Sequence, residues 1–209
     1  MKTIAFATIL SLTMAAHPVN IDITKEVKEK TQMWKPFEPS QNPLSYLTHE
    51  QLLGLLGTRI MPPQGDRAPM QANVEIPEQF DGREHFKQCI HPIRNQMQCG
   101  SCWAFAASEV FSDRMCIASQ GKTDLIFSPE DLVKCDTTDY ACQGGMLNTV
   151  WNYLEKEGIV TEECEPYVSG SGQVPQCSHQ CHDSTIAYQK YKCKAGSVVE
   201  ATNVQQIKE

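Results

Sequence analysis

The chain has 209 residues and a formal net charge of −7, which allows one or two domains with a sizeable core. No basic stripe stands out, so the composition argues against a nucleic-acid partner. Ten cysteines are about twice the usual share, and they indicate an oxidising compartment.

The N-terminus is typical of a signal peptide. Lys2 precedes an apolar run over residues 4–16 that ends in small residues and is too short to span a bilayer. We expect cleavage near Ala15 or Ala16, so residues 1–16 are assigned to the signal peptide. We expect the chain to enter the secretory pathway, with a lysosome, another acidic vacuole or the extracellular space as its destination. No later stretch is long and apolar enough to predict a membrane anchor.

Residues 17–75 form a leader that contains no cysteine, whereas all ten cysteines lie between residues 89 and 193. The leader carries a charged, helix-like stretch at residues 23–33. A second helix is indicated by Thr48, a fair N-cap with Gln51 at capping-box spacing. Residues 62–72 are rich in Pro and Gly and predict a cleavable linker. One interpretation is a disordered leader; the interpretation we favour is a propeptide that covers an active site.

An ordered domain is expected from residue 76, opening with a strand or turn. One helix is predicted over about residues 101–120, ended by Gly121. A second follows Ser128 as N-cap, with Pro129 at its first position. A third begins near Gly145 with an apolar face, and Gly158 ends it. Two further expectations are a strand-like stretch at residues 184–194 and a helical turn at residues 204–209.

The most informative stretch is residues 96–103, Gln-Met-Gln-Cys-Gly-Ser-Cys-Trp. Cys102 falls in the first turn of the first predicted helix, where free backbone N–H groups and the helix dipole favour an anion. A thiolate is such an anion, and it is the reactive form of cysteine. Gln96 offers a side-chain amide that could reach an oxyanion beside the sulfur. Cys102 is therefore a candidate nucleophile and Gln96 a candidate oxyanion donor.

Two other interpretations of the cysteines stay open at this point. Cys102 could be a buried structural residue beside a disulfide cysteine, or part of a Cys-x-x-Cys metal or redox site. His179 and His182 lie beside Cys177 and Cys181 and could suggest zinc. Disulfides in a secretory chain explain these cysteines more simply, so no metal and no cofactor is predicted.

From Trp34 to its end the chain resembles cathepsin B-like cysteine proteases of the papain family. The resemblance rests on Phe80-Asp-Gly-Arg-Glu, on Arg94 to Phe105, on Ser112-Asp-Arg-Met-Cys-Ile, on Ser128-Pro-Glu-Asp-Leu-Val-Lys-Cys, on Cys142-Gln-Gly-Gly, on Cys164-Glu-Pro-Tyr and on Cys177-Ser-His-Gln-Cys. It implies an α+β, papain-like, disulfide-rich fold. Residues 76–209 would be the N-terminal part of the peptidase domain, mainly its helical left half, with the β-rich right half missing from this chain.

The resemblance also implies a disulfide pattern and a substrate site. The implied bridges are Cys89–Cys116, Cys99–Cys142, Cys135–Cys177 and Cys164–Cys181, which leaves Cys193 free. Gly144 and Gly145 would line the cleft and pair with an extended substrate, with Ser101 and Trp103 beside them. Without the family context, the two glycines could also be a simple turn before a helix.

The expected function is that of a cysteine-type endopeptidase acting on protein or peptide substrates through a thioester acyl-enzyme, with the propeptide as intramolecular inhibitor. The branch's carboxydipeptidase activity depends on an occluding loop with a His pair, and the interval over residues 165–176 is short and lacks His. Only 107 residues follow Cys102, and none of the six histidines lies in the context that the family base requires. We therefore expect little or no peptidase activity from these residues alone. The alternative is a catalytically dead, truncated paralogue that acts as a binding or inhibitory module.

Overall fold

The computed structural model describes residues 17–60, 77–201, 203 and 206. The chain divides into two compact units, one up to Leu53 and the other from Gly54 to Glu209. The expected signal peptide, the expected linker and most of the helical turn expected at residues 204–209 lie outside the described residues. No helix of the described part is both long and apolar enough to cross a bilayer.

The first unit contains α1 (Ile21–Lys30) and a 3-10 turn, η1 (Pro39–Gln41). The carbonyl oxygen of the Asn20 side chain accepts the backbone N–H groups of Asp22 and Ile23 and so caps α1. Among the described residues of this unit, only Thr24 and Leu47 are buried. Such a unit has almost no hydrophobic core to stabilise it.

The capping box predicted at Thr48 is confirmed by α2 (His49–Gly54). The Thr48 hydroxyl accepts the N–H of Gln51 at 3.1 Å, and the Gln51 side chain accepts the N–H of Thr48 at 2.8 Å. These reciprocal hydrogen bonds satisfy two backbone donors that the helix start would otherwise leave free.

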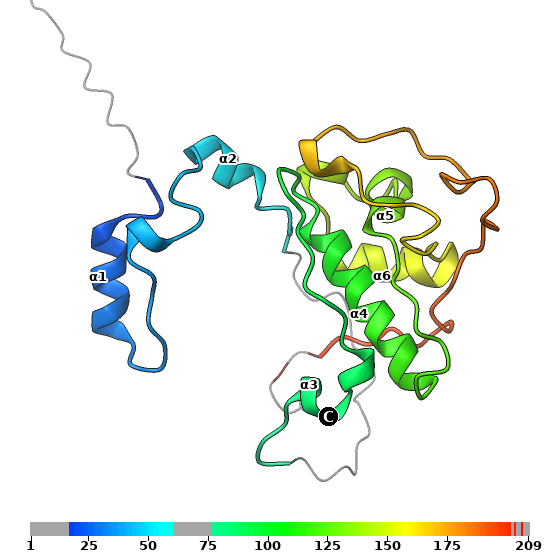
Figure 1. Cartoon of the computed structure of the whole chain (residues 1–209), viewed down its shortest axis with the longest axis horizontal. Coiled ribbons are helices and arrows are strands. Elements are labelled where there is room, and N and C mark those ends of the chain that lie inside the picture. Colours follow the sequence, from blue (N-terminus) through cyan, green and yellow to red (C-terminus); the bar gives the residue numbers. More distant parts are fainter. Residues whose placement is uncertain (1–16, 61–76, 202, 204–205, 207–209) are drawn as a thin grey trace, which may run out of the picture. The chain divides into compact units, whose positions relative to one another are not determined.

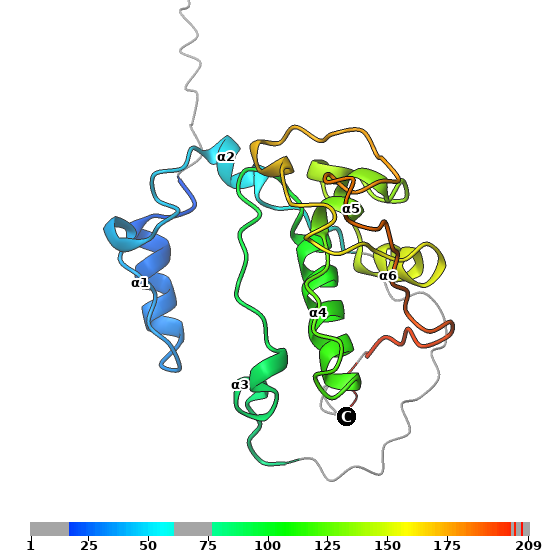
Figure 2. The same cartoon turned by 45° about the vertical axis from the view of Figure 1, so that its right-hand side comes forward.

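The second unit is built around α4 (Cys102–Ala118), with α5 (Pro129–Cys135) and α6 (Leu147–Lys156) beside it (Figure 1). Figure 2, turned by 45°, shows α5 and α6 again on the same side of α4. The shorter elements are α3 (Gly82–His85), η2 (Lys87–Cys89), η3 (Ala141–Gln143) and η4 (Ser169–Ser171).

Apolar side chains from all three long helices form the core of this unit. Trp103 and Phe111 of α4 pack with Leu132 of α5 and Leu154 of α6, and all four are buried. The rings of Phe111 and Phe127 stack with their centroids 4.8 Å apart. Because these contacts fix α4 in the core, they also fix the backbone position of its first residue, Cys102.

The predicted starts and ends of the long helices are confirmed to within a residue or two. Ser128 accepts the N–H of Asp131 at 3.0 Å as the N-cap of α5. Gly121 and Gly158 follow α4 and α6 with φ of 77° and 79°, a conformation that favours glycine.

Two local predictions were wrong. Residues 77–81 form no strand, and the first regular element is the short helix α3, whose N-cap Asp81 accepts the N–H of Arg83. Residues 184–194 form no strand, only an isolated bridge between Tyr191 and Ile159. An alternating pattern forms a strand only when a neighbouring strand is available for pairing, and here the pairing stops after one bridge.

Four disulfides cross-link the second unit, and they join the same pairs that the family resemblance implies: Cys89–Cys116, Cys99–Cys142, Cys135–Cys177 and Cys164–Cys181. Cys102 and Cys193 carry free thiols. The disulfides fix the loops around the helices. Strand pairing contributes little here, because the described residues form only isolated bridges.

Candidate active site

Cys102 is the first residue of α4, and its thiol is partly exposed. Trp103 follows it into the core and is fully buried. The thiol therefore sits at the N-terminal end of a well-packed helix, where the backbone N–H groups and the helix dipole favour a negative charge.

The side chain of Gln96 lies beside this end of the helix. Its amide nitrogen donates to the carbonyl of Cys99 at 2.8 Å and to the carbonyl of Leu55 at 2.9 Å. The first hydrogen bond fixes the amide on its own loop. The second places one N–H toward a carbonyl oxygen of the leader, which shows that this donor can reach an external acceptor.

Tyr167 links the two ends of the loop that carries the nucleophile. Its hydroxyl donates to the backbone carbonyl of Gln96 at 2.8 Å and lies 2.9 Å from the hydroxyl of Ser101. Because the single hydroxyl proton of Tyr167 is used on Gln96, Ser101 is the donor in the second hydrogen bond. Burial raises the pKa of Tyr167, so the hydroxyl stays protonated in this role.

Ser101 and Trp103, expected beside the substrate, are both fully buried. The Trp103 indole N–H donates to the carbonyl of Ala141 at 3.1 Å. A Cβ at Gly145 would lie 2.5 Å from the indole ring, so the glycine lies directly on it. Trp103 thus supports the backbone of Gly145, and both side chains are buried while residues 55–59 pair with Gly145.

The backbone at Gly145 is paired with a piece of the leader, residues 55–59, which we call the blocking segment. The N–H of Gly145 donates to Gly57 and its carbonyl accepts from the N–H of Arg59, both at 2.8 Å. The resulting bridge between Thr58 and Gly145 is parallel. At the same place the hydroxyl of Thr58 lies 3.0 Å from the Cys102 sulfur.

Two glycines, Gly57 and Gly144, make this close approach possible. Gly57 is buried, and a Cβ there would overlap the backbone of Gly100. A Cβ at Gly144 would lie 2.5 Å from the carbonyl oxygen of Gly57. The Gly144-Gly145 edge therefore accepts an extended backbone only because these positions carry no side chain.

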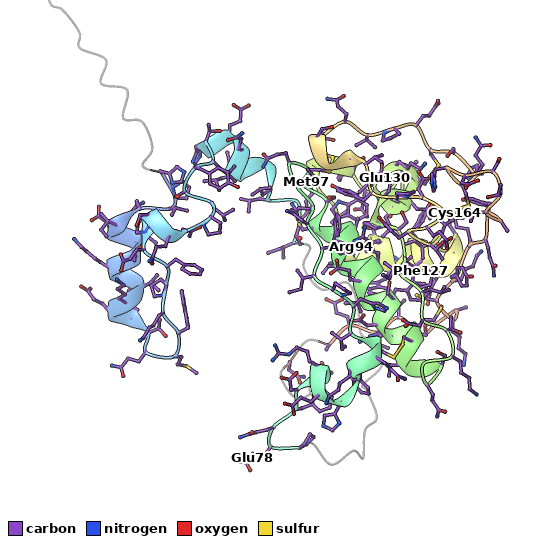
Figure 3. All side chains as sticks on the ribbon, in the orientation of Figure 1. Glu78, Arg94, Met97, Phe127, Glu130 and Cys164 are labelled. Carbon is purple, nitrogen blue, oxygen red and sulfur yellow. A yellow bond between two sulfur atoms is a disulfide. The ribbon has the colours of Figure 1, made fainter. Side chains whose placement is uncertain are left out.

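A buried carboxylate that the sequence did not reveal holds the loop behind the nucleophile. Glu130 of α5 is fully buried and accepts the N–H groups of Val168 and Ser169 at 3.0 Å, and the Ser169 hydroxyl at 2.7 Å. Figure 3 places Glu130 and Met97 near the N-terminal end of α4. The sequence places Glu130 in the first turn of a helix but does not show its partners, which lie 38 and 39 positions along the chain.

The described histidines of the second unit make contacts away from Cys102. His91 lies between two carboxylates, 2.6 Å from Asp113 and 2.9 Å from Asp124. His182 bonds the carbonyl of Cys164, while His85 and His179 contact aromatic rings. The zinc interpretation is also rejected, because Cys177 and Cys181 are both oxidised in disulfides and cannot supply thiolate ligands.

Comparison with known proteins agrees with this geometry. Residues 76–209 match the papain family cysteine protease domain. The chain belongs to the papain family of cysteine proteases. The match includes Gln96, Cys102, Gly144 and Gly145, and it begins after the blocking segment.

Relatives of this papain-family chain are named cathepsin B or cathepsin B-like. Cathepsin B of Dictyostelium discoideum is 32% identical over 213 residues, which cover 93% of this chain and 67% of that protein. Cathepsin B-like CP3 of Giardia intestinalis is 34% identical over 85% of this chain and 60% of its own length. Cathepsin B-like CP2 of the same organism is 44% identical over 53% of this chain and 37% of its own length. The chain thus spans about two fifths to two thirds of these relatives.

Solved structures share the fold. The procathepsin B S9 of Trypanosoma congolense superposes with a TM-score of 0.72 at 27% identity, over 84% of this chain and 63% of that one. The digestive procathepsin L2 of Tenebrio molitor gives a TM-score of 0.62 at 25% identity, over 81% and 55%. Both neighbours are proforms by name.

Proposed function

We propose that this protein is a cysteine endopeptidase in zymogen form, with Cys102 as nucleophile. The thiolate attacks a substrate carbonyl and forms a thioester, and the amine of the cleaved bond leaves. The side-chain amide of Gln96 and the backbone N–H of Cys102 hold the oxyanion, while Gly144 and Gly145 align the peptide. Protein or peptide chains of the secretory pathway, in an acidic vacuole or outside the cell, are the substrates.

The observation that carries this proposal is the blocking segment over the thiol. Thr58 lies 3.0 Å from the sulfur, Gly57 and Arg59 pair with Gly145, and Leu55 accepts from the Gln96 amide. The blocking segment therefore contacts the Cys102 sulfur, the backbone of Gly145 and the side-chain amide of Gln96 at the same time. We infer that residues 17–75 are a propeptide and that these contacts are its inhibitory part.

Activation of the thiol requires a base that the described histidines do not provide at Cys102. A residue from the part of the relatives' length that this chain does not span would deprotonate the thiol and protonate the leaving amine. The helix terminus alone contributes only about 0.3–1 kcal/mol to an exposed charge, so turnover by these 209 residues should be slight. Endopeptidase action is supported by the interval over residues 165–176, which is short and lacks the His pair of an occluding loop. This interval packs against the nucleophile loop, where the carbonyl of Gly170 accepts the N–H of Gln98 at 2.9 Å.

Labelling with a peptidyl epoxide tests the proposal, because this probe requires both a groove and a nucleophilic sulfur. We expect the adduct on Cys102, no adduct in Cys102→Ser, and a slower reaction in Gln96→Ala. Gln88→Ala, which changes an amide on η2 away from the groove, is the matched control. A folded protein in which Cys102 stays unlabelled after leader cleavage would rule the proposal out.

A further inference from the structure

Arg59 of the blocking segment contacts the body with its side chain as well as its backbone. Nη2 of the guanidinium donates to the carbonyl of Gln143 at 3.1 Å. The guanidinium carbon lies 4.2 Å from the centroid of the Tyr140 ring. These two contacts are additional to the pairing of the Arg59 N–H with Gly145.

Both partners suit a cation. The face of an aromatic ring carries negative potential and attracts a guanidinium or ammonium group. The carbonyl of Gln143 is an acceptor that only a donor group can satisfy. The Tyr140 side chain is half exposed, at 50%, so the ring presents a surface to a bound side chain.

The ring and the carbonyl are held in place by their own loop. The N–H of Tyr140 donates to Gly144 at 2.9 Å, and the N–H of Gln143 donates to Tyr140 at 2.9 Å. Between them, Cys142 is tied to Cys99 of the nucleophile loop by a disulfide. A rigid arrangement loses little entropy when a side chain binds, so it can select between side chains.

We propose that Tyr140 and the Gln143 carbonyl form a cation-accepting subsite beside Gly145, which selects arginine or lysine in bound peptides. The inference rests on the proposed function, because Arg59 reaches this subsite from a strand paired to the same edge that a substrate would use. Arg59 then also anchors the leader, and the net charge of −7 favours cationic peptides over acidic ones.

The first test measures alkylation of Cys102 by iodoacetamide in the full chain. Loss of the cation in Arg59→Met, or of the ring in Tyr140→Leu, should raise the rate about fivefold. The double variant should be no faster than either single variant, and Arg59→Lys and Tyr140→Phe should stay near wild type. Arg83→Met, an exposed arginine paired with Asp81, is the control. A wild-type rate in Arg59→Met, or effects that multiply in the double variant, would overturn the subsite.

The second test uses peptidyl epoxides that differ only in arginine or its neutral isostere citrulline, applied to Arg59→Met. The arginine probe should label Cys102 about fivefold faster, and adding Tyr140→Leu should abolish the difference. Equal labelling by both probes refutes the subsite and leaves the proposed nucleophile intact. Labelling by neither probe refutes the proposed function itself.

Discussion

Gly57 brings the backbone of the blocking segment against the backbone of the nucleophile loop. Its carbonyl accepts the N–H of Gly145, and its Cα faces the backbone of Gly100. Backbone atoms cannot move aside as a flexible side chain can. The position of the blocking segment therefore depends on the absence of a side chain at Gly57.

Gly57→Val should displace the blocking segment and speed iodoacetamide labelling of Cys102 by about tenfold or more, since a clash with backbone costs at least ~1–3 kcal/mol. Gly54→Ala is the matched control, because a Cβ at Gly54 meets no atom within 4 Å. An unchanged labelling rate in Gly57→Val would show that the contact does not protect the thiol.

Tyr167 stabilises the nucleophile loop through its hydroxyl, which hydrogen-bonds to Gln96 and Ser101. Tyr167→Phe removes the donor to the part-buried carbonyl of Gln96. It also removes the acceptor of the buried Ser101 hydroxyl, which keeps only a longer hydrogen bond to the carbonyl of Cys99 at 3.5 Å. We expect a loss of about 1–3 kcal/mol in the free energy of unfolding, measured in urea with the disulfides intact.

Tyr188→Phe is the control for this measurement. Within the described structure the buried hydroxyl of Tyr188 has no hydrogen-bond partner, so its removal should leave stability unchanged or raise it. Equal losses in the two variants would mean that the Tyr167 hydroxyl does not hold the nucleophile loop.

At the scale of elements, His91 connects the segment before the nucleophile loop to α4 and to the turn after it. Partial burial disfavours the charged imidazole, but the hydrogen bonds to Asp113 of α4 and to Asp124 outweigh it and raise the pKa of His91. A pKa that is higher in the folded state means that the charged pair stabilises the fold below the ordinary value of 6.5. This contribution is lost as the pH rises through the raised value.

His91→Gln should therefore lower the free energy of unfolding by about 1 kcal/mol at pH 5 and by less at pH 9. Unfolding of wild type and variant in urea at the two pH values measures the difference. His179→Gln is the control, since that ring contacts Tyr188 and, among the described residues, forms no ion pair with a carboxylate. A loss that is equal at both pH values, or larger at pH 9, would contradict the charged pair.

The helices show which parts of the fold local sequence can predict. Ser128, Pro129 and Gly121 define helix ends through the nearby backbone, so α4 and α5 were predictable from short windows. Glu130 and Asp131 follow the same cap, yet their main partners lie far along the chain. Glu130 holds residues 168–169, and Asp131 pairs with Lys190 at 2.8 Å and accepts from Val160 at 3.0 Å. No local pattern contains such partners.

The same limit applies to the site. The motif around Cys102 and Gln96 is contiguous, so both residues could be named from the sequence. Tyr167 lies 71 positions from Gln96, and Tyr140 became informative only once Arg59 was seen above its ring. Ser101 and Trp103 were expected beside the substrate, and their burial and their partners Tyr167 and Ala141 could not be predicted from the motif.

At the scale of the whole molecule, the chain contains two free thiols in contrasting places. Cys102 is at a helix N-terminus under the blocking segment. Cys193 is half-buried, and burial, followed by the charge of Glu155, raises its pKa. A thiol with a raised pKa holds less thiolate at neutral pH and reacts more slowly. Cys193 is therefore an internal reference for the reactivity of Cys102.

Competitive alkylation of the two thiols tests the account most directly. Iodoacetamide is applied to the protein before and after cleavage of the leader, and peptide mass mapping counts the adducts on each cysteine. We predict that cleavage accelerates labelling of Cys102 strongly and that of Cys193 little, so that Cys102 becomes the faster thiol. Preferential labelling of Cys193 in the cleaved protein, or a Cys102 rate that is indifferent to the leader, would contradict a nucleophile covered by its own propeptide.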